Sequence, residues 1–308
     1  MRHLRIGTRG SLLAKWQAEF VRKQLFAGTG AEAEIIIIKT SGDKFANAPL
    51  SQIGGKGIFV KELEEALLDE SIDLAVHSVK DIPTEIPSRL MFPAVCRRED
   101  VRDCLVAANG ATIATLRQGA RVGTGSLRRQ AQLRRMRPDL DVRDLRGNVD
   151  TRLRKVESGE YEAVMLAKAG LDRLGLSNRI TEIMSPETFL PAVGQGAVAV
   201  QCRLKDTEAS ELVSGLDDAE TRTAIIAERA LLSALQGGCQ VPLGAWARIE
   251  RGELVLEACV CSVDGVQFIK QRATAQPEEA AELGGHMAKL LMEAGAQNIL
   301  EEVMRARG

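Results

Sequence analysis

Aromatic residues are scarce in this 308-residue chain, where phenylalanine, tryptophan and tyrosine together make up 3%. Proteins that bind single-stranded nucleic acid usually interleave aromatic side chains with basic ones, yet residues 101–154 contain no aromatic residue. The apolar runs, such as Ile35–Ile38, are far shorter than the ~20 residues of a membrane-spanning helix. The N-terminal segment also lacks the apolar core and cleavage site of a signal peptide. We therefore expect a cytoplasmic protein that binds neither membranes nor nucleic acid.

Cysteine and histidine are too few and too scattered to predict a metal site. The histidines are His3, His77 and His286, and no two cysteines have the Cys-x-x-Cys spacing of a structural zinc site. In a reducing compartment the cysteines should stay free thiols. The six cysteines are Cys96, Cys104, Cys202, Cys239, Cys259 and Cys261.

Charge is balanced over the whole chain but not along it. The 41 basic and 42 acidic residues give a net charge of −1, and the basic residues comprise 29 arginines and 12 lysines. Residues 121–154 hold ten arginines, four aspartates and no lysine or glutamate, a local net charge of +6. A solvated surface would account for such a stretch, but an excess of arginine over lysine favours bidentate binding of carboxylate or phosphate.

Nucleotide binding is a poor explanation for this basic stretch. Gly54–Gly57 lacks the spacing of a Walker motif, and the glycines at 194 and 196 precede a predicted strand instead of following one. A small polycarboxylate is therefore the better prediction for the anion.

Short apolar runs alternate with segments of helical periodicity, which predicts βα units and mostly parallel sheets. The pattern breaks near residues 97–104 and 191–196, and residues 41–57 are predicted to form a mobile glycine-containing loop. The expected strands are 4–8, 34–40, 73–77, 121–123, 141–145, 163–166 and 197–202, and the expected helices are 11–26, 58–69, 126–137, 149–157 and 169–174.

The last third of the chain has a different pattern. A long helix over 218–235 is followed by three alternating runs and a closing helix, which predicts a small antiparallel α+β section. Gly252 can supply a positive φ in the first hairpin turn. The runs span 244–249, 253–262 and 266–273, and the closing helix lies near 277–294.

Two glycine-containing turns join a predicted strand to a predicted helix. In Gly7–Ser11 and Gly123–Ser126, the serine can cap the helix while the helix N-terminus favours an anion. Ordinary capping would explain either turn alone. Arg128 and Arg129, however, fall in the first turn of a helix, where the dipole disfavours cations unless an anion is present.

A charged segment, His77–Pro83, follows a predicted buried strand. The carboxyl end of a parallel strand is where α/β proteins place ligands. Asp81 beside Lys80 could be a surface ion pair. If cationic groups surround it, Asp81 would stay ionised and could stabilise a developing positive charge.

Cys239 lies in a loop between two glycines and a proline, in the segment GGCQVP. A free thiol in a turn is one explanation, and an exposed thiolate that can be alkylated is the other. No histidine is placed by a motif to act as its base, so a papain-like protease is not supported.

Taken together, these segments resemble the porphobilinogen deaminase (hydroxymethylbilane synthase) family. The resemblance covers nearly the whole chain, although the last third matches mainly through GGCQVP. Gly125 stands where the family often has serine, and Asp150 where asparagine is usual. The matching motifs are TRGSLLAKWQ, SGDKFANAPLSQIGGKGIFVKELEEAL, HSVKDIP, VGTGSLRRQAQL, DLRGNVDTRL, AGLDRLGL, PAVGQGA and GGCQVPLGA.

The resemblance implies two α/β lobes like those of type II periplasmic binding proteins and a small C-terminal α+β domain with a three-stranded antiparallel sheet. It implies domain 1 at 1–96 and 197–215, with the catalytic aspartate and the mobile loop. Domain 2, at 102–190, would supply an arginine-rich cleft wall, and domain 3, at 218–308, the cofactor cysteine.

The implied activity is that of a transferase. A dipyrromethane cofactor, itself made from two porphobilinogens, would be linked by a thioether to Cys239. Four more porphobilinogens would be added head to tail with loss of ammonia, and hydrolysis would release hydroxymethylbilane for tetrapyrrole and haem biosynthesis. Asp81 matches the family's catalytic carboxylate, which assists loss of the amino group and stabilises the azafulvene-like cation.

The resemblance also assigns residues to the acetate and propionate groups of the pyrroles. Gln17 and Gln195 match residues that line the cleft, and Lys56 matches the lysine of the mobile loop. The residues matching carboxylate-binding groups are Arg9, Ser11, Lys80, Thr124, Ser126, Arg128, Arg129, Arg146, Arg152 and Arg173.

The family further implies a monomer whose product passes to uroporphyrinogen-III synthase. Two other hypotheses remain open on the residues alone. One is a non-catalytic two-lobed protein that binds a polycarboxylate anion, and the other is nucleic-acid binding through residues 121–154.

Overall fold

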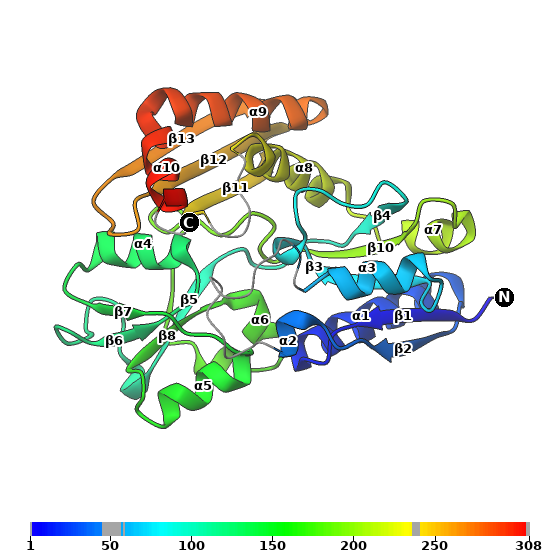
Figure 1. Cartoon of the computed structure of the whole chain (residues 1–308), viewed down its shortest axis with the longest axis horizontal. Coiled ribbons are helices and arrows are strands. Elements are labelled where there is room, and N and C mark those ends of the chain that lie inside the picture. The colour runs from blue at the N-terminus through cyan, green and yellow to red at the C-terminus, as the bar shows by residue number, and fades with distance from the viewer. Residues whose placement is uncertain (1, 45–56, 58, 236–240, 306–308) are drawn as a thin grey trace. The chain divides into compact units, whose positions relative to one another are not determined.

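The computed structural model describes residues 2–44, 57, 59–235 and 241–305 (Figure 1). The chain divides into two compact units. Unit 1 comprises Met1–Glu99 and Gly196–Arg222, and unit 2 comprises Asp100–Gln195 and Thr223–Gly308. No helix in these described ranges is long and apolar enough to cross a membrane. The predicted division into three domains stays a prediction.

Unit 1 is built on a five-stranded mixed sheet with the strand order β2-β1-β3-β10-β4. Strand β1 pairs in parallel with β2 and β3, whereas β10 is antiparallel to both β3 and β4. The elements are β1 (Leu4–Thr8), α1 (Leu12–Thr29), β2 (Ala33–Ile37), α2 (Ser41–Lys44), α3 (Lys61–Leu68), β3 (Leu74–Ser78), the 3-10 turn η1 (Val79–Asp81), β4 (Leu90–Val95), β10 (Val198–Arg203) and α7 (Thr207–Ser214).

Helices cover both faces of this sheet because its strands are apolar on both sides. Val21 and Leu25 of α1 pack with Val213 of α7 against one face, which includes Ile6. Leu63 of α3 belongs to a second apolar cluster on the other face. Burial on both faces holds the ends of β1 and β3 in place.

Unit 2 contains a second five-stranded sheet, with the order β7-β6-β8-β5-β9, and a separate three-stranded sheet, β11-β12-β13. Its first part comprises β5 (Asp103–Ala107), η2 (Ala108–Gly110), β6 (Arg121–Gly123), α4 (Leu127–Met136), β7 (Asp141–Arg143), α5 (Val149–Glu157), β8 (Ala163–Ala167), α6 (Lys168–Arg173), η3 (Ser177–Arg179) and β9 (Glu182–Ile183). The C-terminal part comprises α8 (Ala219–Ala234), which begins in unit 1, β11 (Leu243–Glu250), β12 (Glu253–Cys261), β13 (Phe268–Ala275), η4 (Pro277–Glu279), α9 (Ala280–Leu291), the π-helical turn η5 (Met292–Ala296) and α10 (Gln297–Arg305).

The two five-stranded sheets share one topology. In each, three strands pair in parallel, and the next strand across the sheet is antiparallel to both of its neighbours. The antiparallel strand of unit 2, β5, is the first strand after the chain enters that unit, and that of unit 1, β10, is the first strand after the chain returns to unit 1. The expectation of mostly parallel sheets is therefore wrong for β5 and β10, because each inserts between two strands that run the other way. The predicted fold class, two α/β lobes and a C-terminal α+β section, is confirmed by the strand orders of the three sheets.

The C-terminal sheet follows the predicted pattern. Its first hairpin turns at Arg251 and Gly252, with φ values of 54° and 87°, so both central residues are left-handed as a type I′ turn requires. Helices α8, α9 and α10 pack on the apolar face, where Leu231, Leu283 and Ile299 are buried. Figure 1 shows α9 lying along this sheet.

Several elements differ from the sequence expectation. Strands β4, β5 and β9 and helices α7 and α10 were not expected. The strands and α7 are short segments, which become regular only when they pack on an existing layer, whereas α10 lies beyond the expected end of the closing helix. Ser41–Lys44 forms the short helix α2 in the segment that was expected to be a loop. Residues 45–56 of that loop lie outside the described residues.

Gly284 marks a close approach between α9 and α8. A methyl group there would lie 2.6 Å from Cβ of Ala230 and would also meet the carbonyl oxygen of Ala227, whereas one at Gly285 would meet nothing within 4 Å. We expect Gly284→Ala to lower the free energy of unfolding by about 1–3 kcal/mol through overpacking.

The matched control is Gly285→Ala, which should leave stability unchanged or raise it by up to about 1 kcal/mol, because alanine is the better helix former. Urea unfolding followed by circular dichroism measures both variants. Equal stability of the two variants would show that the helices do not meet at Gly284.

Candidate functional site

In unit 1 the predicted site residues gather at one edge of the sheet. Strands β1 and β3 are parallel neighbours, so the segments that follow them leave the sheet at the same edge. Arg9 and Ser11 follow β1, while Lys80 and Asp81 lie in η1 directly after β3. All four are partly exposed. The edge thus combines one carboxylate with two cationic side chains.

Local hydrogen bonds fix the ends of both strands. Ser11 is the N-cap of α1, and its side chain accepts from the backbone N–H of Ala14 at 3.2 Å. Gln17 of α1 is 3% exposed and donates to Oγ of Ser78 at 2.8 Å. The guanidinium of Arg9 lies 4.0 Å from the ring centroid of Phe59, in cation–π contact.

Three hydrogen-bonded polar side chains, of which His77 and Gln201 are buried, lie beside the end of β3. Nε2 of His77 lies 2.9 Å from Oε1 of Gln201, and Nε2 of Gln201 donates to Oε1 of Glu64 at 3.0 Å. Because the amide nitrogen of Gln201 faces Glu64, its oxygen faces His77, and the proton must lie on Nε2 of His77. Burial, with a smaller effect from the charge of Arg9, lowers the pKa of His77 to about 4. The imidazole is therefore neutral.

In unit 2 the predicted residues follow β6, β7 and β8, which are parallel neighbours. Thr124 is fully buried after β6, and its Oγ1 accepts from the backbone N–H of Ser126 at 3.2 Å. Ser126 caps α4 by accepting from the backbone N–H of Arg129. The serines of both predicted anion-binding turns, Ser11 and Ser126, therefore cap α1 and α4. Each turn follows the carboxyl end of a parallel strand, β1 in unit 1 and β6 in unit 2.

Asp103, at the start of β5, is a residue that the sequence reasoning missed. Its carboxylate is fully buried and accepts from Nη1 of Arg128 at 2.6 Å, from Nε and Nη2 of Arg129 at 2.9 and 2.7 Å, and from Nε2 of Gln195 at 2.9 Å. The two arginines are 3% and 6% exposed. Two residues predicted to bind carboxylates and one predicted to line the cleft thus meet on one internal carboxylate.

The charge state of this cluster follows from its contacts. Burial alone would raise the pKa of Asp103, but the charges of Arg128 and Arg129, with their hydrogen bonds and that of Gln195, hold it well below its usual range. Asp103 is therefore ionised and neutralises one of the two guanidiniums. A sequence signal for it existed, since cations in the first turn of α4 require an anion.

A second buried carboxylate holds the segment that carries Gln195. Glu228 of α8 is fully buried, and its two oxygens accept from the backbone N–H groups of Gly194 at 2.7 Å and Ala247 at 2.8 Å. Gly194 has a φ of 72°, which favours glycine. Glu228 thus holds the backbone next to Gln195, while Asp103 accepts from the Gln195 side chain.

The other arginines of the basic stretch are largely engaged within the unit. Arg146 lies 3.4 Å from Asp144, and Arg152 donates to the carbonyl of Gly147 at 2.8 Å. Arg173 ends α6 and is partly exposed. Further ion pairs join Arg137 to Asp139, Arg143 to Asp141 and Arg154 to Asp150. These four aspartates are already counted in the net charge of +6, and Asp103, from outside the stretch, offsets one further charge.

Two predicted residues, Cys239 and Lys56, lie outside the described residues. The five described cysteines are all buried. Burial raises the pKa of Cys104 and Cys259 to about 12 and that of Cys261 to about 11. These thiols are poor nucleophiles near neutral pH.

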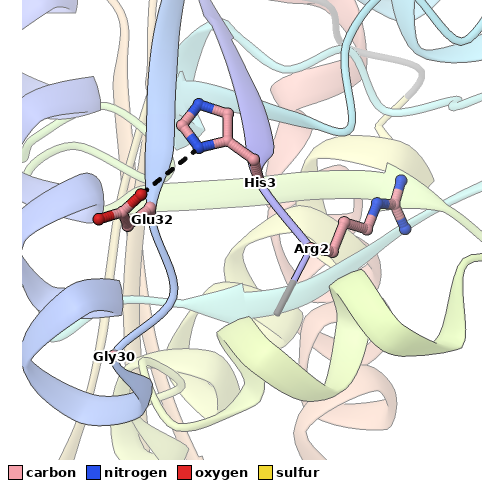
Figure 2. Close-up of a pocket in the computed structure, with 4 residues that line it drawn as sticks. All are labelled: Arg2, His3, Gly30 and Glu32. Carbon is pink, nitrogen blue, oxygen red and sulfur yellow. Dashed lines mark ion pairs between the residues drawn. The ribbon is translucent and has the colours of Figure 1, made fainter.

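A cavity of about 260 Å³ lies elsewhere in unit 1, lined by Arg2, His3, Gly30 and Glu32 (Figure 2). Nδ1 of His3 and the carboxylate of Glu32 are 3.9 Å apart there. Arg2 and His3 precede β1, whereas the predicted site residues follow it. The cavity is therefore at the opposite edge of the sheet from Asp81.

Comparisons with known proteins agree with the motif pattern. Residues 4–211 match the family described as "Porphobilinogen deaminase, dipyromethane cofactor binding domain", and residues 222–293 match "Porphobilinogen deaminase, C-terminal domain". A porphobilinogen deaminase of Syntrophobacter fumaroxidans is 46% identical over 306 residues, 99% of each chain. One of Syntrophotalea carbinolica is 50% identical over 298 residues, 96% of this chain and 95% of the relative.

Two solved binding-protein structures are similar at much lower identity. The methionine-binding protein MetQ has a TM-score of 0.45 and 12% identity, covering 70% of this chain and 89% of its own. A periplasmic substrate-binding protein of Coxiella burnetii has a TM-score of 0.42 and 17% identity, covering 69% and 91%.

The buried His77 predicts a pH dependence of stability. Its pKa is lowered from 6.5 to about 4 on folding, so between these values the unfolded state binds a proton that the folded state excludes. Stability is fully present above pH 6.5 and falls as the pH drops towards 4, by about 3 kcal/mol from this residue.

His77→Gln keeps an amide at the position of Nε2 but cannot titrate. Urea unfolding from pH 4 to 7 should give this variant a flatter stability profile than the wild type by about that amount. Parallel profiles for the two proteins would show that His77 does not titrate differently on folding.

Proposed function

The chain belongs to the porphobilinogen deaminase family, and from this premise we propose that it polymerises porphobilinogen. Four porphobilinogens are joined head to tail onto a dipyrromethane that is bound through a thioether to Cys239. Hydrolysis then releases the linear hydroxymethylbilane, a precursor in tetrapyrrole biosynthesis. The observation that carries this proposal is the edge of unit 1 where Asp81 follows β3 beside Lys80 and near the arginine-bearing turn after β1.

Each elongation step exchanges one bond for another. The aminomethyl C–N bond of a porphobilinogen breaks and ammonia leaves, and a C–C bond forms to the free α-carbon of the terminal pyrrole, which loses its proton. No oxidant or reductant is needed. The difficult point is the cation left on the pyrrole when the amine departs, and this is where a fixed carboxylate contributes most.

Asp81 is the proposed catalytic residue for this cation. Its carboxylate lies on η1, which is joined to the segment before β10 by a hydrogen bond from Val79 N–H to the carbonyl of Ala197 at 3.0 Å. The turn itself is closed by a hydrogen bond from Ile82 N–H to the carbonyl of Val79 at 3.1 Å. A carboxylate held on such a support can accept from the pyrrole N–H and stabilise positive charge without first reorganising.

The residues present fit a dipyrromethane by charge. Each pyrrole carries an acetate and a propionate, so the cofactor brings four carboxylates, and burying unpaired carboxylates would be costly. In unit 1 Arg9, Ser11 and Lys80 would bind carboxylates, with Gln17 lining the cleft, and in unit 2 the partly exposed Arg146, Arg152 and Arg173 would bind carboxylates. When bound, the dipyrromethane supplies the free pyrrole carbon to which the first substrate is joined.

The buried cluster in unit 2 would act differently. Arg128 and Arg129 already bind Asp103, so they offer a substrate carboxylate one surplus positive charge between them, together with Thr124, Ser126 and Gln195. Lys56 is proposed to contact substrate from its glycine-rich segment. Cys239 is proposed as the attachment point because the other five cysteines are buried.

The remaining features are proposed from the family alone. The protein would be a cytoplasmic monomer, and its unstable linear product would be passed to uroporphyrinogen-III synthase. A non-catalytic polycarboxylate-binding protein is the alternative that the experiments below would reveal.

The covalent cofactor predicts a mass difference. Intact mass spectrometry of the purified protein should give the sequence mass plus one dipyrromethane, and Ehrlich's reagent should colour it. Cys239→Ser should give the plain sequence mass and no colour, while Cys261→Ala, a substitution at a buried thiol, should retain the increment. Unmodified mass in active protein would contradict the proposed attachment, and a colourless protein that cannot consume porphobilinogen would favour the non-catalytic alternative.

Asp81→Asn removes the charge but keeps the size of the side chain. We expect turnover of porphobilinogen to fall by about 10²–10⁴-fold, because the developing cation loses its counter-charge, with an unchanged circular dichroism spectrum. Asp69→Asn, at the exposed end of α3 in the same unit, is the control and should stay near wild type. Near-wild-type turnover of Asp81→Asn would remove Asp81 from the mechanism.

A further inference from the structure

The carboxylate of Asp103 is placed to control the orientation of two arginines at once. One oxygen, Oδ1, accepts from Nε and Nη2 of Arg129 and from Gln195, and the other, Oδ2, accepts from Nη1 of Arg128. Two donors of Arg129 to one oxygen fix the plane of its guanidinium. Nη1 of Arg128 is further held by the carbonyl of Leu190 at 2.7 Å, and Nη1 of Arg129 by the carbonyl of Met165 at 3.0 Å.

Arg128 and Arg129 would be unfavourable neighbours without a nearby negative charge. Arg128 and Arg129 are consecutive residues in the first turn of α4, at the positive end of the helix dipole. Two buried guanidiniums there repel each other and lose their hydration. Asp103 offsets one of the two charges, so the cluster of three residues keeps a single positive charge.

We propose that Asp103 is a positioning residue for substrate binding, which sets the orientation of Arg128, Arg129 and Gln195 before a substrate carboxylate arrives. This rests on the proposed function, in which those three residues contact substrate. Preorganised donors bind without having to be ordered first. A guanidinium that loses its fixed partner keeps its charge but no longer holds a defined direction.

A purely structural ion cluster would also be buried and paired, so the test must separate the two roles. If Asp103 only stabilises the fold, its loss reduces the amount of folded enzyme, and the folded fraction keeps the wild-type KM. If Asp103 positions the arginines, KM for porphobilinogen rises in the protein that remains folded.

Two variants test this on cofactor-loaded protein, with loading checked by intact mass. Asp103→Asn removes the charge and replaces one acceptor oxygen with a donor that faces guanidinium N–H groups. Asp103→Glu keeps the charge but displaces the carboxylate by one methylene group. The control is Asp139→Asn, which removes a carboxylate paired with Arg137 at 2.6 and 2.7 Å in the same unit.

We expect KM to rise roughly tenfold or more in both Asp103 variants, since small displacements of binding groups have large effects, with a smaller change in kcat and with wild-type KM in Asp139→Asn. Asp103→Glu retains the charge balance and provides the measurement if Asp103→Asn does not fold. A wild-type KM in the folded fraction of either variant would overturn the proposal. If wild-type protein neither carries the cofactor mass nor consumes porphobilinogen, the proposed function itself fails, which is a distinguishable result.

Discussion

The internal ion cluster of Asp103 with Arg128 and Arg129 is the interaction on which the arrangement of unit 2 depends. It joins the first strand of the unit to the first turn of α4, and through Gln195 it reaches the segment at which the chain leaves the unit. Glu228 fixes the same segment from α8 through the backbone of Gly194. Two buried carboxylates, Asp103 and Glu228, thus hold the loop that precedes β10. Both carboxylates have hydrogen-bond donors, because an unpaired buried charge would be strongly unfavourable.

The same principle explains how a protein with balanced charge can present a cationic site. Most arginines of residues 121–154 have an acidic or carbonyl partner within unit 2, which orients the guanidinium group. The acidic partners also offset its charge. What remains is a small number of directed positive charges at the carboxyl edge of the sheet. In unit 1 the corresponding edge adds Arg9 and Lys80 to the single carboxylate of Asp81. Under the proposed function, this partial compensation would suit a growing polycarboxylate, since fully unpaired arginines would repel one another when substrate is absent.

Several strands and helices could be predicted from the sequence, whereas the sheet order and the role of Asp103 could not. Strong local patterns gave the strand at Arg121–Gly123 and the helix at Val149–Glu157 with the bounds that the structure has. Helix α10 was missed, because its helical periodicity lies beyond the segment where the closing helix was expected to end. The order β7-β6-β8-β5-β9 was also beyond prediction, since the antiparallel insertion of β5 depends on contacts with strands far along the chain. Asp103 was missed because it lies in residues 97–104, where the alternation of predicted strands and helices breaks.

The sequence by itself determined the motifs, the turns that follow β1, β3 and β6, and the requirement that arginines in the first turn of α4 meet an anion. Those features depend on residue type and on separations of a few residues, which local conformational preferences decide. Only the tertiary structure decided that the anion is Asp103, which is 25 residues from Arg128 along the chain. A buried ion pair forms wherever folding brings the two groups out of water together, and the pairing of β5 with β8, not any local pattern, places Asp103 beside α4.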